Sequence, residues 1–181
     1  MMRRFAFVAA LACSITAVAA GNAGAATSMS TFLVFVEPTI SASATGLTLE
    51  SELEGSFNVA DRSASGNGTF QVMDGATVID SGTFTLTGLV AFQFYGCGEV
   101  TTPDGRISLP PEFCGGRVIL AVHATSSTTG EQTDGLYEVN CQIHDPGGQA
   151  PPGTSEGVKV NARGINFNKH VTGDNLFVML P

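Results

Sequence analysis

The sequence predicts an all-β protein, an antiparallel up-and-down β-barrel of about eight to ten strands, with a two-sheet β-sandwich as the alternative. Two observations predict this class. Apolar and polar residues alternate with a period of two over most of the chain, and Gly, Pro, Asn and Asp residues interrupt the alternation at short intervals. Such alternation between turn signals is typical of antiparallel strands with one buried face, and consecutive short connections favour a meander.

The clearest strand pattern runs through residues 68–96. Phe70 and Phe84 each begin a short alternating run, and Asp74-Gly75 between them predicts a tight turn, because glycine accepts a positive φ. Gly82 and Gly88 divide the rest, so we expect four short strands in this stretch. The last of them carries three apolar side chains on one face: Val90, Phe92 and Phe94.

Residues 1–26 are typical of a secretory signal peptide. Arg3 and Arg4 form a basic start, and residues 5–20 are an uncharged, apolar run that leads into small residues. A cleaved signal has this pattern, whereas a membrane-spanning helix needs about 20 apolar residues. Residues 27–181 are then expected to form a single β-rich domain that is secreted and works outside the cytoplasm.

The charge of the chain excludes several classes of partner. Without the signal peptide, six basic residues stand against 16 acidic residues, which gives a net charge of −10. Such a surface repels phosphate backbones and anionic lipid headgroups, so we expect no nucleic-acid partner. No later stretch is long and apolar enough for a spanning helix, so we expect no membrane span after signal cleavage.

The remaining strands follow from the same alternation. Residues 31–36 are almost wholly apolar, and we expect this strand to end at Pro38, which has no amide proton for a sheet ladder. From Leu47 onward, leucines alternate with glutamates, which we interpret as a solvated outer face, with a Ca²⁺ site on those glutamates as the alternative. The other expected strands cover residues 118–125, 136–144, 158–167 and 175–179.

Three cysteines follow the predicted signal peptide. Cys97 and Cys114 lie near the two ends of a long loop rich in Gly and Pro, between two predicted strands. If these strands pair, a Cys97–Cys114 disulfide closes the loop and contributes about 3 kcal/mol of stability. Cys141 alternates with Tyr137 and Val139 on an apolar face, so we expect it to be a buried thiol, with Cys97–Cys141 as the rival disulfide.

The sequence carries no strong catalytic, metal or cofactor motif. It lacks the signatures of a hydrolase nucleophile, a zinc protease, a phosphate-binding loop and a dinucleotide-binding fold. Cys141 and His144 are three apart on a predicted strand and so face opposite sides, and we expect no metal site and no cofactor. His123 shares a strand face with Ile119 and Ala121, where a lone histidine is usually a hydrogen-bonded structural residue.

These observations favour a secreted, non-enzymatic protein that binds a small apolar ligand inside the barrel or a protein partner through its end loops. One alternative is a cavity-type barrel enzyme, such as a cyclase or isomerase, with His123 and then Tyr137 as its catalytic residues. Another is a protease inhibitor that presents the loop between Cys97 and Cys114. The aromatic residues expected to contact a ligand, or otherwise to fill the core, are Phe70, Phe84, Phe92, Phe94 and Tyr137.

Overall fold

The computed structural model describes residues 30–102, 105–143 and 155–181, so the predicted signal peptide lies outside the described residues. The described chain is all-β, as predicted, and it contains no helix that is long and apolar enough to cross a membrane. Its strands are β1 (Thr31–Ser43), β2 (Leu47–Asn58), β3 (Ala64–Asp74), β4 (Thr77–Cys97), β5 (Val100–Thr102), β6 (Gly105–Ile107), β7 (Phe113–Ser126), β8 (Gln132–Cys141), β9 (Gly157–Ala162), β10 (Ile165–Thr172) and β11 (Asn175–Met179).

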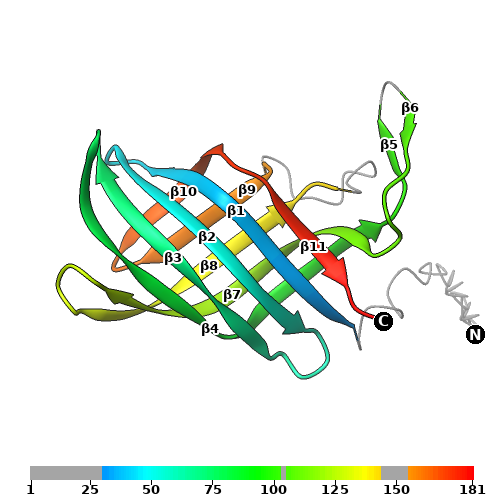
Figure 1. Cartoon of the computed structure of the whole chain (residues 1–181), viewed down its shortest axis with the longest axis horizontal. Helices are drawn as coiled ribbons and strands as arrows, with labels where there is room; N and C mark the ends of the chain where they lie inside the picture. Colours follow the sequence, from blue (N-terminus) through cyan, green and yellow to red (C-terminus); the bar gives the residue numbers. More distant parts are fainter. Residues whose placement is uncertain (1–29, 103–104, 144–154) are drawn as a thin grey trace, which may run out of the picture.

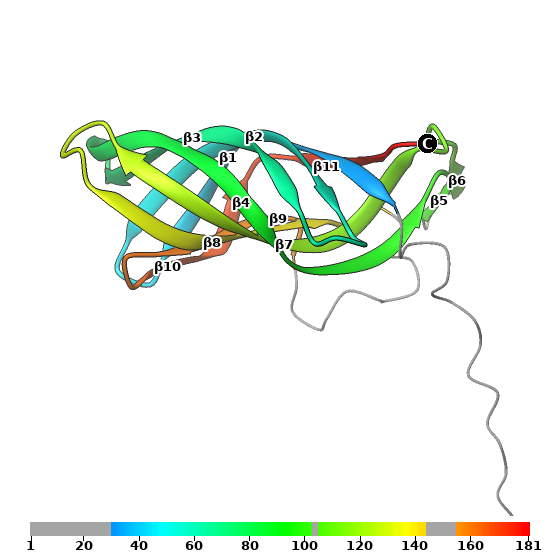
Figure 2. The ribbon, with the colours of Figure 1, turned by 90° about the horizontal axis from the view of Figure 1, so that it is seen from below.

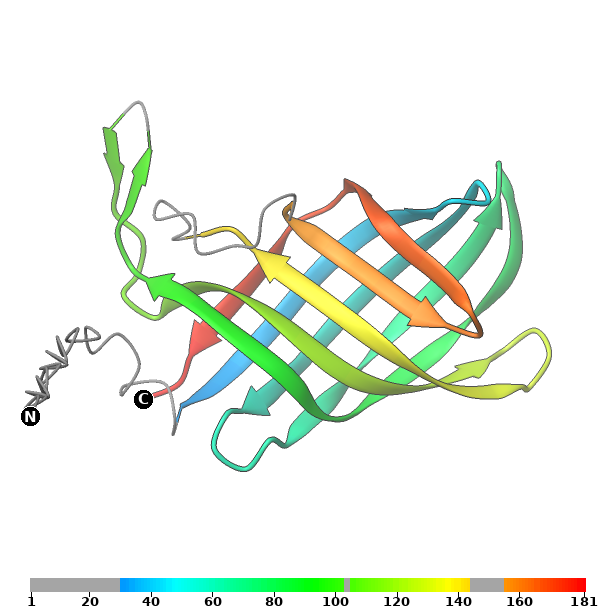
Figure 3. The ribbon, with the colours of Figure 1, turned by 180° about the vertical axis from the view of Figure 1, so that it is seen from behind.

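Nine of these strands form one antiparallel sheet that closes on itself in a ring (Figures 1 and 3). β1 to β4 follow one another around the ring, β4 pairs with β7, and β7 to β10 follow in order until β10 pairs with β1. These eight strands succeed one another up and down, as the short connections predicted. The ring therefore leaves no long edge of the sheet unpaired.

The ninth strand, β11, makes the two ends of the ring different. It pairs with the first part of β1 and with the start of β7. At this end, which we call the narrow end, one strand thus replaces the three strands β8 to β10 between β7 and β1. The opposite end, the wide end, carries the β1–β2, β3–β4, β7–β8 and β9–β10 connections, toward the left of Figure 1.

β4 is one continuous strand of 21 residues, although three short strands were predicted over its length. Gly82 and Gly88, which predicted turns, lie inside it. Two β-bulges near Gly88 shift its pairing with β7. Because a bulge changes which residues face inward, Leu89 is buried and Val90 is 39% exposed, whereas the simple alternation had placed Val90 inside.

Two inward-facing glycines make room for two phenylalanine rings. β3 and β4 pair so that Gly68 lies opposite Phe84 and Gly82 lies opposite Phe70. A Cβ added at Gly68 would lie 2.3 Å from the Phe84 ring, and one at Gly82 would lie 2.1 Å from the carbonyl oxygen of Thr125. Each ring packs against the backbone of the opposite glycine, which accounts for the two Gly-Thr-Phe triplets of this region.

Two other strands differ from the prediction. β1 continues past Pro38, because a register shift between Val36 and Thr39 leaves the proline out of the ladder. The expected strand over residues 158–167 is divided into β9 and β10 by a turn at Arg163-Gly164, where φ is 53° and 74°. Two-residue hairpin turns with two positive φ angles strongly prefer Asn-Gly or Asp-Gly, so an arginine gave no turn signal here.

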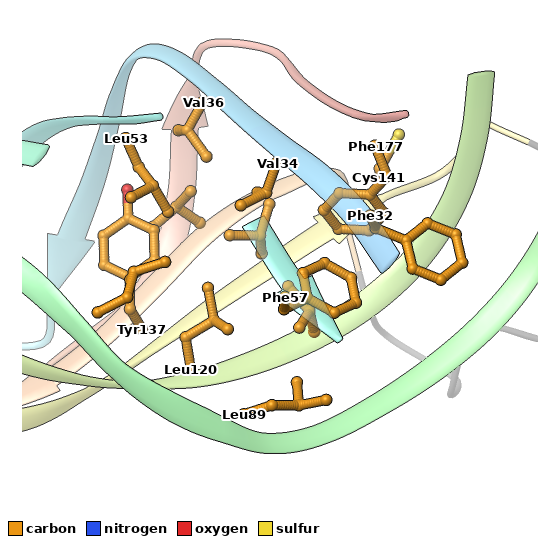
Figure 4. Close-up of a cluster of buried hydrophobic side chains, with 14 of the residues drawn as sticks. Phe32, Val34, Val36, Leu53, Phe57, Leu89, Leu120, Tyr137, Cys141 and Phe177 are labelled. Atoms are coloured by element: carbon orange, nitrogen blue, oxygen red, sulfur yellow. The ribbon is translucent and has the colours of Figure 1, made fainter. Parts of the chain in front are cut away.

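Aromatic side chains fill the narrow end (Figure 4). Phe32 is stacked on Phe57 with 5.2 Å between ring centroids, and Phe57 meets Phe92 edge-on at 4.9 Å. Phe94 and Phe177 complete this aromatic cluster. Buried aromatic rings contribute large apolar areas and favour such tilted and edge-on contacts, so these rings form the core of the narrow end.

The predicted disulfide joins Cys97 to Cys114. The two residues lie opposite each other in the β4–β7 ladder, so the bond closes the base of the segment that carries β5 and β6. This hairpin projects away from the ring, at the end opposite the β7–β8 connection (Figure 2). Cys141 is free and buried, as predicted.

We expect Gly82→Ala to lower the free energy of unfolding by about 1–3 kcal/mol, because the new methyl group would overlap a backbone oxygen in a packed wall. Gly88→Ala is the matched control in the same strand, since the atom nearest to its Cβ is the Arg62 carbonyl oxygen at 3.9 Å. Urea titrations measure the free energy of unfolding of both variants. Equal midpoints for the two would contradict the glycine–phenylalanine packing.

Candidate functional site

An apolar cavity of about 190 Å³ opens at the wide end of the ring. Its walls come from the inner faces of β2, β3, β4, β7, β8, β9 and β10. The hairpin connections of the wide end surround its mouth. Its apolar lining includes Leu49, Phe70, Phe84, Val122, Tyr137 and Phe167.

Phe84 and Tyr137 form the floor of the cavity. Both line it, and both also belong to the buried core that continues toward the narrow end. Their rings stack with 5.1 Å between centroids, and the Tyr137 hydroxyl lies 2.9 Å from Ser51 Oγ in a buried hydrogen bond. Burial raises the pKa of Tyr137, so the phenol stays neutral and the floor carries no charge.

Charged side chains gather at the mouth. Arg163, in the β9–β10 turn, pairs with Asp80 of β4 at 3.3 Å and with Glu131 of the β7–β8 connection. Ser126 donates a hydrogen bond of 2.6 Å to Asp80 Oδ1. We call Asp80, Ser126, Glu131 and Arg163 the mouth cluster; it joins three separate parts of the ring over an otherwise apolar chamber.

The five aromatic residues predicted to contact a ligand fall into two groups. Phe70, Phe84 and Tyr137 line the cavity. Phe92 and Phe94 lie in the aromatic cluster of the narrow end. Alternation in the sequence identifies which side chains face inward, but it carries no information about how far along the ring each one lies.

His123 lies on the outer face of β7. Its two chain neighbours, Val122 and Ala124, line the cavity, so His123 points to the other side of the wall. Its Nδ1 is 2.8 Å from Asp134 Oδ1, and this hydrogen bond raises the pKa of His123. A catalytic pairing with Tyr137 would need both side chains in one chamber, and the wall of the ring separates them.

Sequence reasoning did not single out Asp80, Glu131 or Arg163. Each stands in a polar stretch or near a strand end, where charged residues are common. The three are brought together by the closure of the ring, and no spacing along the chain encodes that contact. The one local signal, a left-handed φ at Arg163, is a property of the folded turn.

A second polar group lies where β8 ends and β9 begins. A carboxylate oxygen of Glu156 accepts a hydrogen bond from the backbone N–H of Gln142, and Asn140 Nδ2 donates to the Ser155 carbonyl oxygen at 2.8 Å. Burial, opposed by the Gln142 hydrogen bond, raises the pKa of Glu156 to about 7. Burial also raises the pKa of the neighbouring Cys141 to about 12, which leaves its thiol protonated and unreactive at neutral pH.

In the part of the chain that the structure describes, no three His, Cys, Asp or Glu residues are grouped so that they could hold a metal ion. On the outer face of β2, Glu52 accepts a hydrogen bond of 2.9 Å from Thr69 Oγ1, and both Glu52 and Glu54 are exposed.

Comparison of the chain with protein-family models, with curated proteins and with solved structures found no match. The function is therefore inferred from the cavity and its mouth.

We expect Glu156 to make the free energy of unfolding fall as the pH rises from about 4.5 to about 7. Over this range the folded protein holds the Glu156 proton that the unfolded chain has already lost, so the folded state binds more protons and loses this advantage as the pH rises. Urea midpoints measured across the range test this. Glu156→Gln should flatten the dependence, and Glu54→Gln, at an exposed position of β2, is the matched control. If the free energy of unfolding of Glu156→Gln depends on pH as steeply as that of the wild type, the pH dependence does not come from Glu156.

Proposed function

We propose that this protein is a secreted β-barrel that binds one small apolar molecule in the wide-end cavity, without catalysing a reaction. The observation that carries the proposal is an apolar chamber within a closed ring of strands, closed by the aromatic cluster at one end and open at the other. An eight-stranded barrel has an interior wide enough for one small ligand.

The energetics of such a site favour modest affinity. Burial of about 200 Å² of ligand surface is worth on the order of 5 kcal/mol at 25 cal/mol per Å². The loss of ligand motion subtracts from this gain, whereas a preformed chamber spares the cost of rearranging the protein. We therefore place the dissociation constant of a fitting ligand at about 0.2 mM or above.

Location outside the cytoplasm is supported by the chemistry of the chain. The Cys97–Cys114 disulfide is of a kind that persists in oxidising compartments. It agrees with the predicted signal peptide and with the acidic composition, which favours solubility. Together these features support a mature protein that acts as an extracellular or periplasmic carrier of its ligand.

We expect Ala124→Leu to weaken the binding of toluene by about tenfold or more, because the larger side chain fills part of the chamber. Ala121→Leu adds the same volume to the outer face of β7 and is the matched control. Isothermal titration and native mass spectrometry of the mature, unreduced protein measure binding, and the melting temperature of each free variant reports whether it folds.

A wild-type protein that gains neither mass nor stability with toluene, indole or cyclohexanone would contradict the cavity proposal. It would direct attention to the β5–β6 hairpin, where Ile107 is 52% exposed, as the surface for a protein partner. Equal weakening by Ala124→Leu and Ala121→Leu would place the ligand outside the chamber.

A further inference from the structure

We propose that Arg163 is the gate of the cavity, that the charges of the mouth cluster exclude ionic ligands, and that the ligand is a compact, uncharged ring compound. This inference rests on the proposed function, because it names the ligand class of that same chamber. It follows from the span of the Arg163 ion pairs, the charge of the mouth cluster and the size of the chamber.

The Arg163 side chain crosses the mouth of the cavity. β9 and β4 are not neighbours, because β8 and β7 lie between them in the ring. Three interstrand spacings along the wall amount to about 14 Å. Nevertheless, Arg163 Nη1 lies 3.3 Å from Asp80 Oδ2, so the guanidinium bridges the opening and stands between the chamber and solvent.

The two ion pairs of Arg163 differ in strength. Asp80 is held in place, since its Oδ1 accepts hydrogen bonds from the Ser126 hydroxyl and the Ser81 N–H, and its side chain is 17% exposed. Glu131 is 60% exposed and stands on a hairpin connection. An exposed ion pair contributes little and breaks readily. We infer that the Arg163–Glu131 pair breaks first, and that the mouth opens when the guanidinium then leaves Asp80.

The mouth cluster disfavours an anionic ligand. Its two carboxylates outnumber its one guanidinium, which is already paired with both, so a ligand carboxylate would have to displace one of them. The net charge of −10 that remains without the predicted signal peptide adds to the repulsion. A cationic ligand would have to compete with Arg163 for the same carboxylates and would leave its charge beside apolar walls, which is costly. An uncharged molecule meets neither obstacle.

The dimensions of the chamber set the size of the ligand. An engineered apolar cavity of about 150 Å³ in another protein holds benzene, so 190 Å³ suits a molecule of roughly six to ten non-hydrogen atoms. The stacked rings of Phe84 and Tyr137 form the floor, and the aromatic cluster fills the interior beyond it. A long acyl chain therefore has no space in which to extend, whereas a single aromatic or alicyclic ring fits.

A second arginine provides a control for the unusual backbone of this turn. Arg62 also has a left-handed φ, of 59°, and lies in the β2–β3 connection at the narrow end. Its guanidinium donates a hydrogen bond to the Val90 carbonyl oxygen of β4. Replacement of Arg62 changes an arginine with the same left-handed backbone conformation without touching the mouth.

The ligand class is tested with nitrobenzene and benzoate, which have the same shape and differ in charge. By titration calorimetry at neutral pH, we expect nitrobenzene to bind at least about 30-fold more tightly than benzoate. Equal or tighter binding of benzoate would overturn this inference and leave the proposed function intact. If neither nitrobenzene nor toluene binds, the proposed function itself fails.

The gate is tested with Arg163→Met, which keeps an apolar stem and removes the charge. We expect the association and dissociation rate constants of nitrobenzene, measured by NMR exchange, both to rise about fivefold or more, with the dissociation constant changed by less than about threefold. Glu131→Gln breaks the exposed pair without altering the turn, and it should raise the rates and improve benzoate binding. Arg62→Met should change neither rates nor affinity.

Two results would overturn the gate. One is a large loss of nitrobenzene affinity in Arg163→Met with no gain in the association rate constant, which would make Arg163 a direct ligand contact. The other is rate constants in both Arg163→Met and Glu131→Gln that equal those of the wild type, which would mean that the ligand enters elsewhere. Melting temperatures of all variants show whether each is folded under the conditions of the binding measurements.

Discussion

The change in the number of strands between the two ends of the closed sheet is the constraint on which the rest of the structure depends. At the narrow end β11 alone fills the place that β8, β9 and β10 fill at the wide end. A ring with fewer strands is narrower, so large aromatic side chains can meet across it and form a solid core. The wider end cannot be closed in this way, and its inward-facing residues leave a chamber. The bulges and inward-facing glycines of β3 and β4 adapt the wall to this taper.

The sequence predicted the class of fold and, for much of the chain, which side chains face inward, because both depend on local alternation. β2 and β8 follow it closely, with Leu49, Leu53, Tyr137 and Val139 buried. The disulfide was predictable because its cysteines flank one loop. The length of β4 was not, since a glycine that accommodates an opposite ring looks the same in a sequence as a glycine that makes a turn. The mouth cluster was not predictable either, because Asp80 and Arg163 meet only through closure of the ring.

In the proposed binding protein, the packed narrow end stabilises the fold and the open wide end holds the ligand. The aromatic cluster and the disulfide lie at the narrow end, where they can support the fold without facing the cavity. The chamber itself presents apolar walls, a neutral floor and one bridged mouth. In the proposed binding protein, recognition depends on the shape of this chamber and on the exclusion of charge. The position of His123 on the outer face separates it from Tyr137, the other catalytic candidate named from the sequence.

The central claim is that the wide end holds an accessible, apolar chamber. It is tested most directly by a crystal structure of the mature protein under xenon pressure, since xenon enters apolar cavities. We predict a xenon peak within the ring, in contact with Phe84, Val122 and Phe167, and beneath the mouth cluster. A wide end filled by collapsed side chains, or by ordered waters that hydrogen-bond to polar groups, would contradict the account.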